Sequence, residues 1–224
     1  MLLVFDLDGT LINSRRDLAE SANELLQGYG AAPLAEEAVG RMVGEGAGVL
    51  VARVLAARGI QAPQAEALAR YLAIYDRRLL DHTVAYDGIE DVLRTFRSTE
   101  RLAVLTNKPA PPTNRILTAL GLDNYFEWVI GGDSRFGKKP SPDAMRWLME
   151  QAGTRPGDTV LIGDSLVDVQ TARAAGTLAC VARYGFGFLN MPDDGLDGRE
   201  LVIDAPADLP AVLRAHVSRP SATV

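Results

Sequence analysis

The sequence predicts an α/β fold, in which a parallel sheet is covered by helices on both faces and interrupted by an all-helical insertion. Short apolar runs of strand length alternate with helical patterns over most of the chain, whereas the stretch between residues 14 and 83 contains helical patterns alone. At 224 residues the chain can bury a sizeable core and is long for one compact unit. We therefore expect a core domain of residues 1–13 and 84–224 and an inserted helical domain of residues 14–83.

Strands are expected where apolar runs are bounded by turn or acidic residues. These runs are residues 2–6, 102–106, 128–131, 159–163, 178–182 and 200–203. The helical patterns between them span residues 88–98, 111–120, 142–152, 166–175 and 207–215. Strands that alternate with helices form a parallel sheet, because each helix carries the chain back across one face of the sheet. The expected core is therefore Rossmann-like.

The insertion begins with a helix start signal. Ser14, followed by Asp17 three residues later, predicts a capping box, and Leu18, Ala22 and Leu25 fall on one face of the helix that follows. Further helices are indicated at residues 35–43, 49–57 and 64–80. These amphipathic patterns predict a small helical unit with its own buried side.

Two acids lie at the end of the first expected strand, in the segment Asp6-Leu7-Asp8-Gly9-Thr10. Because the side chains of a strand alternate between its two faces, Asp6 and Asp8 project to the same side. Carboxylates so close together raise one another's pKa unless a cation lies between them, and Mg²⁺ prefers carboxylate oxygens. Gly9 allows a sharp turn, and the N–H groups and the Thr10 hydroxyl can receive an anion. The segment therefore predicts a Mg²⁺ site beside an anion site.

Polar side chains stand at further turns and strand ends. Thr106-Asn107 ends the second expected core strand, Lys138-Lys139 precedes a proline-marked turn, and Asp164 follows the strand at 159–163, with Asp168 about one helical turn beyond it. In open parallel sheets, ligands bind at the carboxyl ends of the strands. We therefore expect these side chains to meet the first acid pair at one edge of the sheet.

Composition narrows the class of partner. The net charge of −6 and the lack of a Lys and Arg stripe argue against nucleic acid. No apolar run reaches membrane-spanning length, and the amino terminus lacks a basic segment followed by a long apolar stretch, so we expect no membrane partner and a cytoplasmic location. Cys180 lies in an apolar run and is expected to be a small buried side chain.

The polar segments, in this order and each at a strand end or turn, resemble the four motifs of the haloacid dehalogenase superfamily. Because the insertion follows the first motif, the resemblance implies a helical cap that opens and closes over a phosphate site. It implies that Asp6 is the nucleophile, which forms an aspartyl phosphate, and that Asp8 is the general acid and base. Dehalogenases of the superfamily lack the second acid, so the presence of Asp8 favours phosphate transfer.

The second and third motifs would bind the phosphoryl group. By resemblance, Thr106 and the backbone around Asn107 hydrogen-bond a phosphoryl oxygen. Lys139, directly before Pro140, neutralises charge on the transferring group, and Lys138 is the competing candidate. Lys108 stays open between contact with the substrate phosphate and exposure to water.

The fourth motif would complete the metal site. By resemblance, Asp164 binds Mg²⁺ together with Asp6 and the backbone carbonyl of Asp8. Asp168 is expected to support the site by orienting the motif lysine or a metal-bound water. The cofactor implied is therefore Mg²⁺, and chelation is expected to abolish activity.

Within the superfamily, the resemblance points to phosphoglycolate phosphatases through the cap segment at residues 43–47. A small phosphorylated metabolite, 2-phosphoglycolate, is then the implied substrate, and its leaving group carries a carboxylate. The candidate donors in the cap are Arg41 and the backbone N–H groups of the loop formed by Gly44, Glu45, Gly46 and Ala47. The Glu45 side chain must point away from an anionic substrate.

Alternatives to a phosphatase stay open. A sugar phosphomutase of the beta-phosphoglucomutase kind shares the acid pair and the cap placement but returns the phosphoryl group to a sugar. A non-catalytic phosphate-sensing protein would retain only the binding residues. The sequence also leaves monomer and homodimer open.

Overall fold

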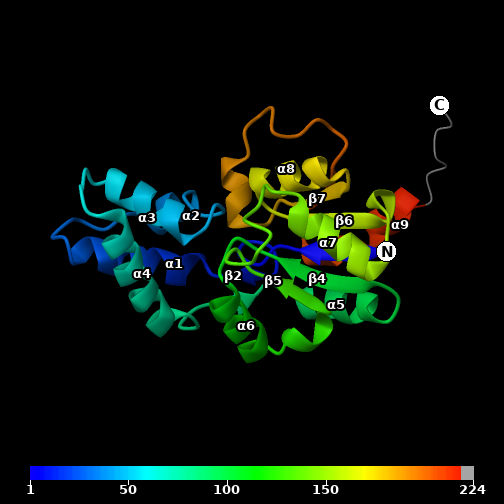
Figure 1. The fold of residues 1–224 in the computed structure, drawn as a ribbon, viewed down its shortest axis with the longest axis horizontal. Coiled ribbons are helices and arrows are strands. Elements are labelled where there is room, and N and C mark those ends of the chain that lie inside the picture. The colour runs from blue at the N-terminus through cyan, green and yellow to red at the C-terminus, as the bar shows by residue number, and fades with distance from the viewer. Residues whose placement is uncertain (218–224) are drawn as a thin grey trace.

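The computed structural model describes residues 1–217 and has a six-stranded sheet at its centre (Figure 1). The strand order is β5-β4-β1-β6-β7-β8, and every neighbouring pair is parallel. The strands are β1 (Leu2–Phe5), β4 (Arg101–Leu105), β5 (Trp128–Ile130), β6 (Thr159–Gly163), β7 (Leu178–Ala182) and β8 (Leu201–Ile203). The predicted α/β class and the parallel sheet are confirmed.

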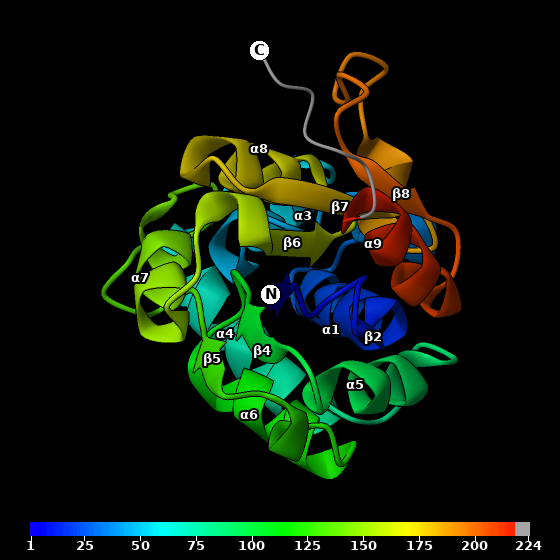
Figure 2. The same ribbon diagram turned by 90° about the vertical axis from the view of Figure 1, so that its right-hand side faces the viewer.

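Helices cover both faces of the sheet, as the uninterrupted apolar sequence of β1 requires. Leu3 and Phe5 belong to one buried hydrophobic cluster, whereas Leu2 and Val4 belong to another. Figure 2 shows the helices in layers on either side of the strands. The first cluster includes residues of α5 (Ile89–Arg97), α6 (Ala110–Ala119) and α9 (Leu209–Val217), and the second includes residues of α7 (Asp143–Ala152) and α8 (Leu166–Ala175).

The predicted insertion is helical and lies beyond one end of the sheet, at the left of Figure 1. Its helices are α1 (Arg15–Gln27), α2 (Glu36–Gly40), α3 (Ala47–Ala56) and α4 (Gln64–Arg78). Helix α1 packs against the other three, and its predicted apolar face, with Leu18, Ala22 and Leu25, is buried. Buried residues of these helices and of the sheet form one continuous cluster, so the division into core and cap domains stays a prediction.

A small antiparallel ladder, which the sequence did not indicate, lies where the chain enters and leaves the helical part. It pairs β2 (Ile12–Asn13) with β3 (Val84–Ala85), with Ile12 opposite Ala85. Strands of two residues are too short for a period of two to be visible in the sequence. The ladder ties the two crossing segments together at the expected boundary.

The predicted capping box at Ser14 and Asp17 is wrong. The Ser14 hydroxyl donates to Asp8 Oδ1 at 2.5 Å and does not cap the helix. Asp17 is fully buried, and its Oδ2 accepts hydrogen bonds from the backbone N–H groups of His82 and Thr83 at 3.0 and 2.8 Å. Contacts between distant segments have replaced the local cap, because a buried carboxylate must be hydrogen-bonded.

Two other helix predictions need correction. The helix expected at residues 35–43 is only the five residues of α2, and a turn follows it before the glycine loop. The helix expected at residues 207–215 begins with a 3₁₀ turn, and α9 follows from Leu209. The 3₁₀ helices of the described chain are Asp123–Tyr125, Pro156–Asp158, Phe186–Asn190 and Pro206–Asp208.

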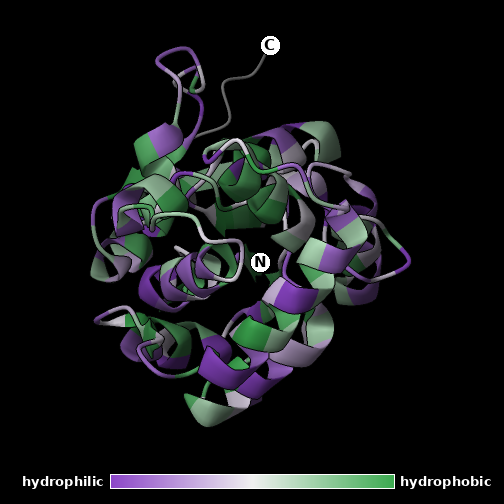
Figure 3. Cartoon of the chain, turned by 90° about the vertical axis from the view of Figure 1, so that its left-hand side faces the viewer, coloured by the Kyte–Doolittle hydropathy of each residue, from purple (hydrophilic) through white to green (hydrophobic). Residues whose placement is uncertain are grey.

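Hydrophobic residues concentrate on the strands in the middle of the molecule, and many hydrophilic residues lie on the outer helices (Figure 3). Cys180 is buried, as predicted. Among residues 1–217, no helix has the length and apolar character needed to cross a membrane.

Candidate active site

The sheet order brings three sequence-predicted residues to one edge. Strand β1 lies between β4 and β6, so the positions that directly follow these strands, Asp6, Thr106 and Asp164, are neighbours. All three side chains are buried. The parallel direction of the strands therefore creates the site, because each carboxyl end opens toward the same side.

The ammonium group of Lys139 lies at the same edge of the sheet, between the carboxylates of two acids. Its Nζ lies 2.8 Å from Asp6 Oδ1 and 2.6 Å from Asp168 Oδ1. The second oxygen of Asp168 accepts hydrogen bonds from the backbone N–H and the hydroxyl of Ser165, which fixes the carboxylate at the start of α8. Lys138, the competing candidate, is exposed.

Three buried carboxylates can converge on one cation. Oxygens of Asp6, Asp164 and Asp168 lie within 4.8 Å of one another. Burial raises the pKa of Asp6, the charge of Lys139 lowers it and the charge of Asp168 raises it, and the resulting pKa is about 6. Burial likewise raises the pKa of Asp164 well above its ordinary value. Buried carboxylates are costly to ionise unless a positive charge lies beside them. A divalent cation, which prefers oxygen ligands, would supply that charge.

Glycines leave room around Asp164. A Cβ at Gly9, which has φ of 87°, would lie 1.9 Å from Asp164 Oδ2, and one at Gly185 would lie 2.4 Å from the same oxygen. The backbone N–H of Gly187 donates to this oxygen at 2.7 Å. Side chains at these positions would fill the space beside the carboxylate, so the loops that follow β1 and β7 form a cradle around the acid cluster.

In the metal-free protein, the contribution of Asp6 to stability is expected to decrease as the pH rises from about 4 to about 6. An acid whose pKa is raised by folding holds its proton more tightly in the folded state. Its stabilising contribution is therefore present below the unfolded pKa, which is 3.8 for Asp6, and is lost as the pH rises through the folded value of about 6.

Thermal unfolding across this pH range, with and without Mg²⁺, measures the effect. Bound cation is expected to flatten the dependence, and Asp6→Asn is expected to reduce it without metal. A metal-free wild-type protein whose stability, measured relative to that of Asp6→Asn, increases over the same interval would contradict the raised pKa of Asp6.

Asp8 is separate from the acid cluster and is paired with Lys108. Lys108 Nζ lies 2.8 and 2.9 Å from the two oxygens of Asp8, and the hydroxyl of Ser14 donates to one of them. Lys108 is buried, so it does not face water. Asp6 and Asp8, two residues apart, therefore have different partners, and each carboxylate is held by its own lysine.

Asn107 links three segments of the chain. Its Oδ1 accepts the backbone N–H of Lys139 at 2.8 Å, and its Nδ2 donates to the carbonyls of Lys139 and Gly44 at 3.1 and 3.0 Å. Thr106 Oγ1 accepts the backbone N–H of Lys108 at 3.2 Å, which leaves its hydroxyl proton for another acceptor. The second motif thus connects the lysine turn to the helical part.

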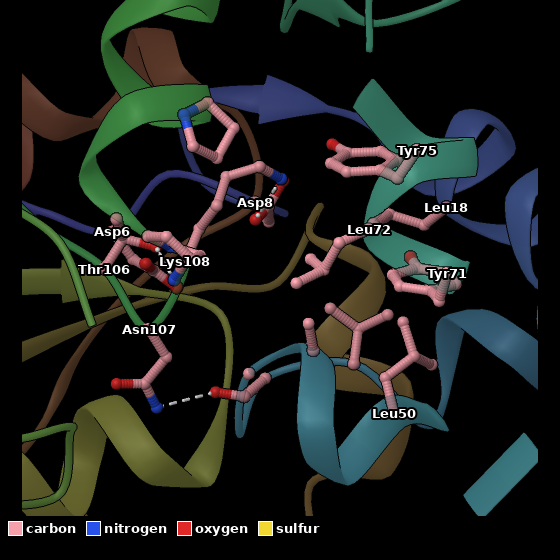
Figure 4. Close-up of a pocket in the computed structure, with 16 residues that line it drawn as sticks. Asp6, Asp8, Leu18, Leu50, Tyr71, Leu72, Tyr75, Thr106, Asn107 and Lys108 are labelled. Carbon is pink, nitrogen blue, oxygen red and sulfur yellow. Dashed lines mark hydrogen bonds and ion pairs between the residues drawn. The ribbon is translucent and has the colours of Figure 1, made fainter. Parts of the chain in front are cut away.

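A cavity of about 60 Å³ lies between these strand ends and the helices α3 and α4 (Figure 4). Polar residues that follow β1 and β4 line one side, whereas Leu18, Leu50, Leu72 and two tyrosines line the other. Asp6 belongs both to the lining and to the acid cluster, so it joins the two. A buried water needs about 10 to 15 Å³, so the space suits only a small molecule.

The family of the protein follows from comparison with known sequences. Residues 3–182 match the model of the haloacid dehalogenase-like hydrolases. The chain belongs to this family. The matched span includes all the acids and lysines described above, and the predicted resemblance is therefore confirmed.

Relatives within this hydrolase family share most of the chain. A phosphoglycolate phosphatase of Pseudomonas putida is 41% identical over 217 residues, which cover 95% of this chain and 78% of the relative. One of Rhodospirillum rubrum is 42% identical over 193 residues, covering 82% of this chain and 80% of the relative. The crystal structure of a predicted phosphoglycolate phosphatase from Haemophilus somnus superposes with a TM-score of 0.85 at 29% identity, covering 95% of this chain and 97% of that one.

Of the cap residues predicted to select the substrate of this hydrolase, some line the cavity and others do not. Gly44, Gly46 and Ala47 line the cavity. Arg41 is exposed and is not among the described residues that line it, and its backbone carbonyl accepts a hydrogen bond from Asn190. Glu45 is also exposed and pairs with Arg53.

Replacing Glu45 by Gln is expected to change kcat/KM within about threefold for both phosphoglycolate and a neutral phosphomonoester, because an exposed ion pair contributes little. Steady-state kinetics on the two substrates measure this. A gain of about tenfold confined to phosphoglycolate would instead place the carboxylate of Glu45 in the pocket.

Two tyrosines that line the cavity, Tyr71 and Tyr75, were not predicted from the sequence as site residues, and the role of Lys108 was left open. Tyr71 and Tyr75 of α4 line the cavity together with Lys108, whose Nζ lies 4.8 Å from the centroid of the Tyr75 ring. Their spacing of four residues, with Ala67 one turn earlier, indicates a buried helix face in a polar helix. The spacing alone cannot show that this face meets the strand ends.

Proposed function

We propose that this hydrolase is a Mg²⁺-dependent phosphatase that acts on 2-phosphoglycolate through a phosphorylated Asp6. The observation that carries the proposal is that two aspartates line one cavity and that each is paired with a different lysine. Asp6 lies in the buried acid cluster beside Lys139, and Asp8 lies in the cavity beside Lys108. A nucleophile and a separate proton donor are what hydrolysis of a phosphomonoester through a covalent intermediate requires.

The two acids would act in two steps. In the first, a carboxylate oxygen of Asp6 bonds to phosphorus while the bond from phosphorus to the leaving oxygen breaks, and Asp8 gives that oxygen a proton. In the second, Asp8 takes a proton from a water molecule that attacks the phosphorus of the aspartyl phosphate. Inorganic phosphate leaves, and Asp6 is regenerated.

The remaining residues would stabilise charge. Lys139 is held beside Asp6 by Asp168 and would neutralise the phosphoryl oxygens, while the Thr106 hydroxyl would donate to one of them. Asp6, Asp164 and the backbone carbonyl of Asp8 would hold Mg²⁺, which screens the negative charges of nucleophile and substrate when bound. Asp168 would support the site as a positioning residue.

The cavity favours a small anionic substrate. Its volume is about 60 Å³, and among the described residues Lys108 is the cationic side chain that lines it. Phosphoglycolate is small and has an anionic leaving group. The names of the Pseudomonas and Rhodospirillum relatives support the same substrate.

A phosphate-release screen of about a hundred phosphorylated metabolites tests the proposal, because specificity is a ratio of kcat/KM values. We expect 2-phosphoglycolate to rank highest and a chelator to abolish the release. Conversion of a sugar 1-phosphate to its 6-phosphate without phosphate release would instead identify a phosphomutase. Release from no substrate, with Mg²⁺ present, would contradict an enzymatic function.

A further inference from the structure

Two tyrosine hydroxyls in the cavity are buried without a partner. Tyr71 and Tyr75 are 1% and 5% exposed, and neither hydroxyl has a hydrogen-bond partner among the described residues. A buried polar group without a hydrogen bond costs about 1 to 3 kcal/mol. Such a cost is tolerated where a ligand supplies the missing partner, so these hydroxyls mark a binding surface.

Both hydroxyls belong to one face of α4 and meet the cavity. The two residues are four apart, and their rings stack with centroids 6.0 Å apart. Lys108 Nζ lies 4.8 Å from the centroid of the Tyr75 ring. Figure 4 shows the Tyr75 hydroxyl on the side of Lys108 and Asp8, across the cavity from Thr106 and Asn107.

We propose that the hydroxyls of Tyr71 and Tyr75, with the ammonium group of Lys108, bind the carboxylate of the leaving group. The inference rests on the proposed phosphatase function and adds the residues that select the substrate. The phosphoryl group is assigned to the opposite side, where Asp6, Thr106 and Lys139 lie. The leaving group is then the part of the substrate that reaches α4.

Donor chemistry favours a carboxylate over a neutral group. A carboxylate accepts several hydrogen bonds, and the ammonium group of Lys108, which donates to the two oxygens of Asp8, has a third N–H for it. Burial raises the pKa of both tyrosines well above the ordinary value of 10.0, so each hydroxyl keeps its proton and can donate. Leu18, Leu50 and Leu72 border the same space, and an apolar border strengthens hydrogen bonds by excluding water.

Tyr71→Phe, Tyr75→Phe and the double variant test the inference with matched substrates. Phosphoglycolate and ethyl phosphate differ mainly in the carboxylate, so the ratio of their kcat/KM values isolates its recognition. Each single variant is expected to lower this ratio about tenfold, mostly through KM for phosphoglycolate, because the contact is present before the reaction. The inhibition constant of glycolate against ethyl phosphate hydrolysis should rise by a similar factor.

Tyr29→Phe is the matched control. Tyr29 also has a buried hydroxyl without a partner among the described residues, but it lies outside the cavity lining. Its loss should leave the substrate ratio and the glycolate inhibition constant unchanged. Thermal unfolding midpoints of all the variants should not fall, because each substitution removes a buried hydroxyl that lacks a partner.

The outcomes separate the two proposals. An unchanged ratio and an unchanged inhibition constant in the double variant, with phosphoglycolate hydrolysis retained, would overturn the tyrosine assignment and leave the phosphatase function intact. A wild-type protein that hydrolyses ethyl phosphate as well as phosphoglycolate and is not inhibited by glycolate would overturn it as well. Phosphate release from neither ester would remove the function on which the inference rests.

Discussion

Replacing Asp6 by Asn is expected to lower kcat by at least about a thousandfold while the protein stays folded. The amide cannot form the acyl phosphate, and the substitution also removes one of the two carboxylates, Asp6 and Asp164, that are proposed to hold Mg²⁺. A thousandfold loss corresponds to about 4 kcal/mol of transition-state stabilisation. Because burial raises the pKa of Asp6 to about 6, the neutral amide should not destabilise the metal-free fold.

Asp204→Asn is the matched control for this variant. Asp204 also directly follows a strand, β8, but its carboxylate is at the surface and pairs with Arg183 at 2.8 Å. Its loss should leave phosphate release within about twofold, since exposed pairs contribute little. Turnover of Asp6→Asn near the wild-type value would remove Asp6 from the nucleophile role.

Replacing Lys139 by Ala is expected to lower kcat by about a hundredfold or more, a loss of about 3 kcal/mol. The ammonium group contacts Asp6 and Asp168 at 2.8 and 2.6 Å. Without it, those buried carboxylates and the incoming phosphate repel one another. The thermal unfolding midpoint should also fall, because removing one partner of a buried ion pair leaves the other uncompensated.

Kinetics are therefore measured well below the unfolding midpoint of the variant, with its folded fraction checked by circular dichroism. Lys138→Ala is the control, since this neighbouring lysine is exposed, and its effect should be mild. The reverse order of effects, with the larger loss at Lys138, would mean that the exposed lysine moves into the site when substrate binds.

The core of the site was predictable from the sequence because strand direction determines it. Asp6, Thr106 and Asp164 each follow an apolar run, and a parallel sheet places all such positions at one edge. The pairing of Lys139 with Asp6 and Asp168 needed only the proline-marked turn to approach this edge. Local pattern and topology agree here, so the prediction did not depend on details of packing.

Contacts between distant segments were not predictable in the same way. Ser14 and Asp17 fit a local capping box, yet their side chains bind Asp8 and the backbone of residues 82 and 83. The role of Lys108 stayed open because its partner Asp8 is 100 residues away in the sequence. A local motif states which bonds a side chain can make, whereas tertiary packing decides which of them form.

The cap prediction was incomplete for a related reason. The glycine loop was expected to face the substrate, and Gly44, Gly46 and Ala47 do line the cavity. Tyr71 and Tyr75 have the spacing of an ordinary buried helix face, and only the tertiary structure shows that this face also lines the cavity at the strand ends. Helix periodicity identifies a buried side but does not show what it is buried against.

The phosphorylation of Asp6 is the central claim, and trapping the intermediate tests it most directly. Asp8→Ala should slow the second step, because the proposed base that activates water is missing. After brief incubation with phosphate-labelled 2-phosphoglycolate and Mg²⁺, acid quenching and peptide mapping should find the label on Asp6, and Asp6→Asn in the same background should remove it. Label on another residue, or turnover of Asp8→Ala at the wild-type rate with no labelled peptide, would contradict the mechanism.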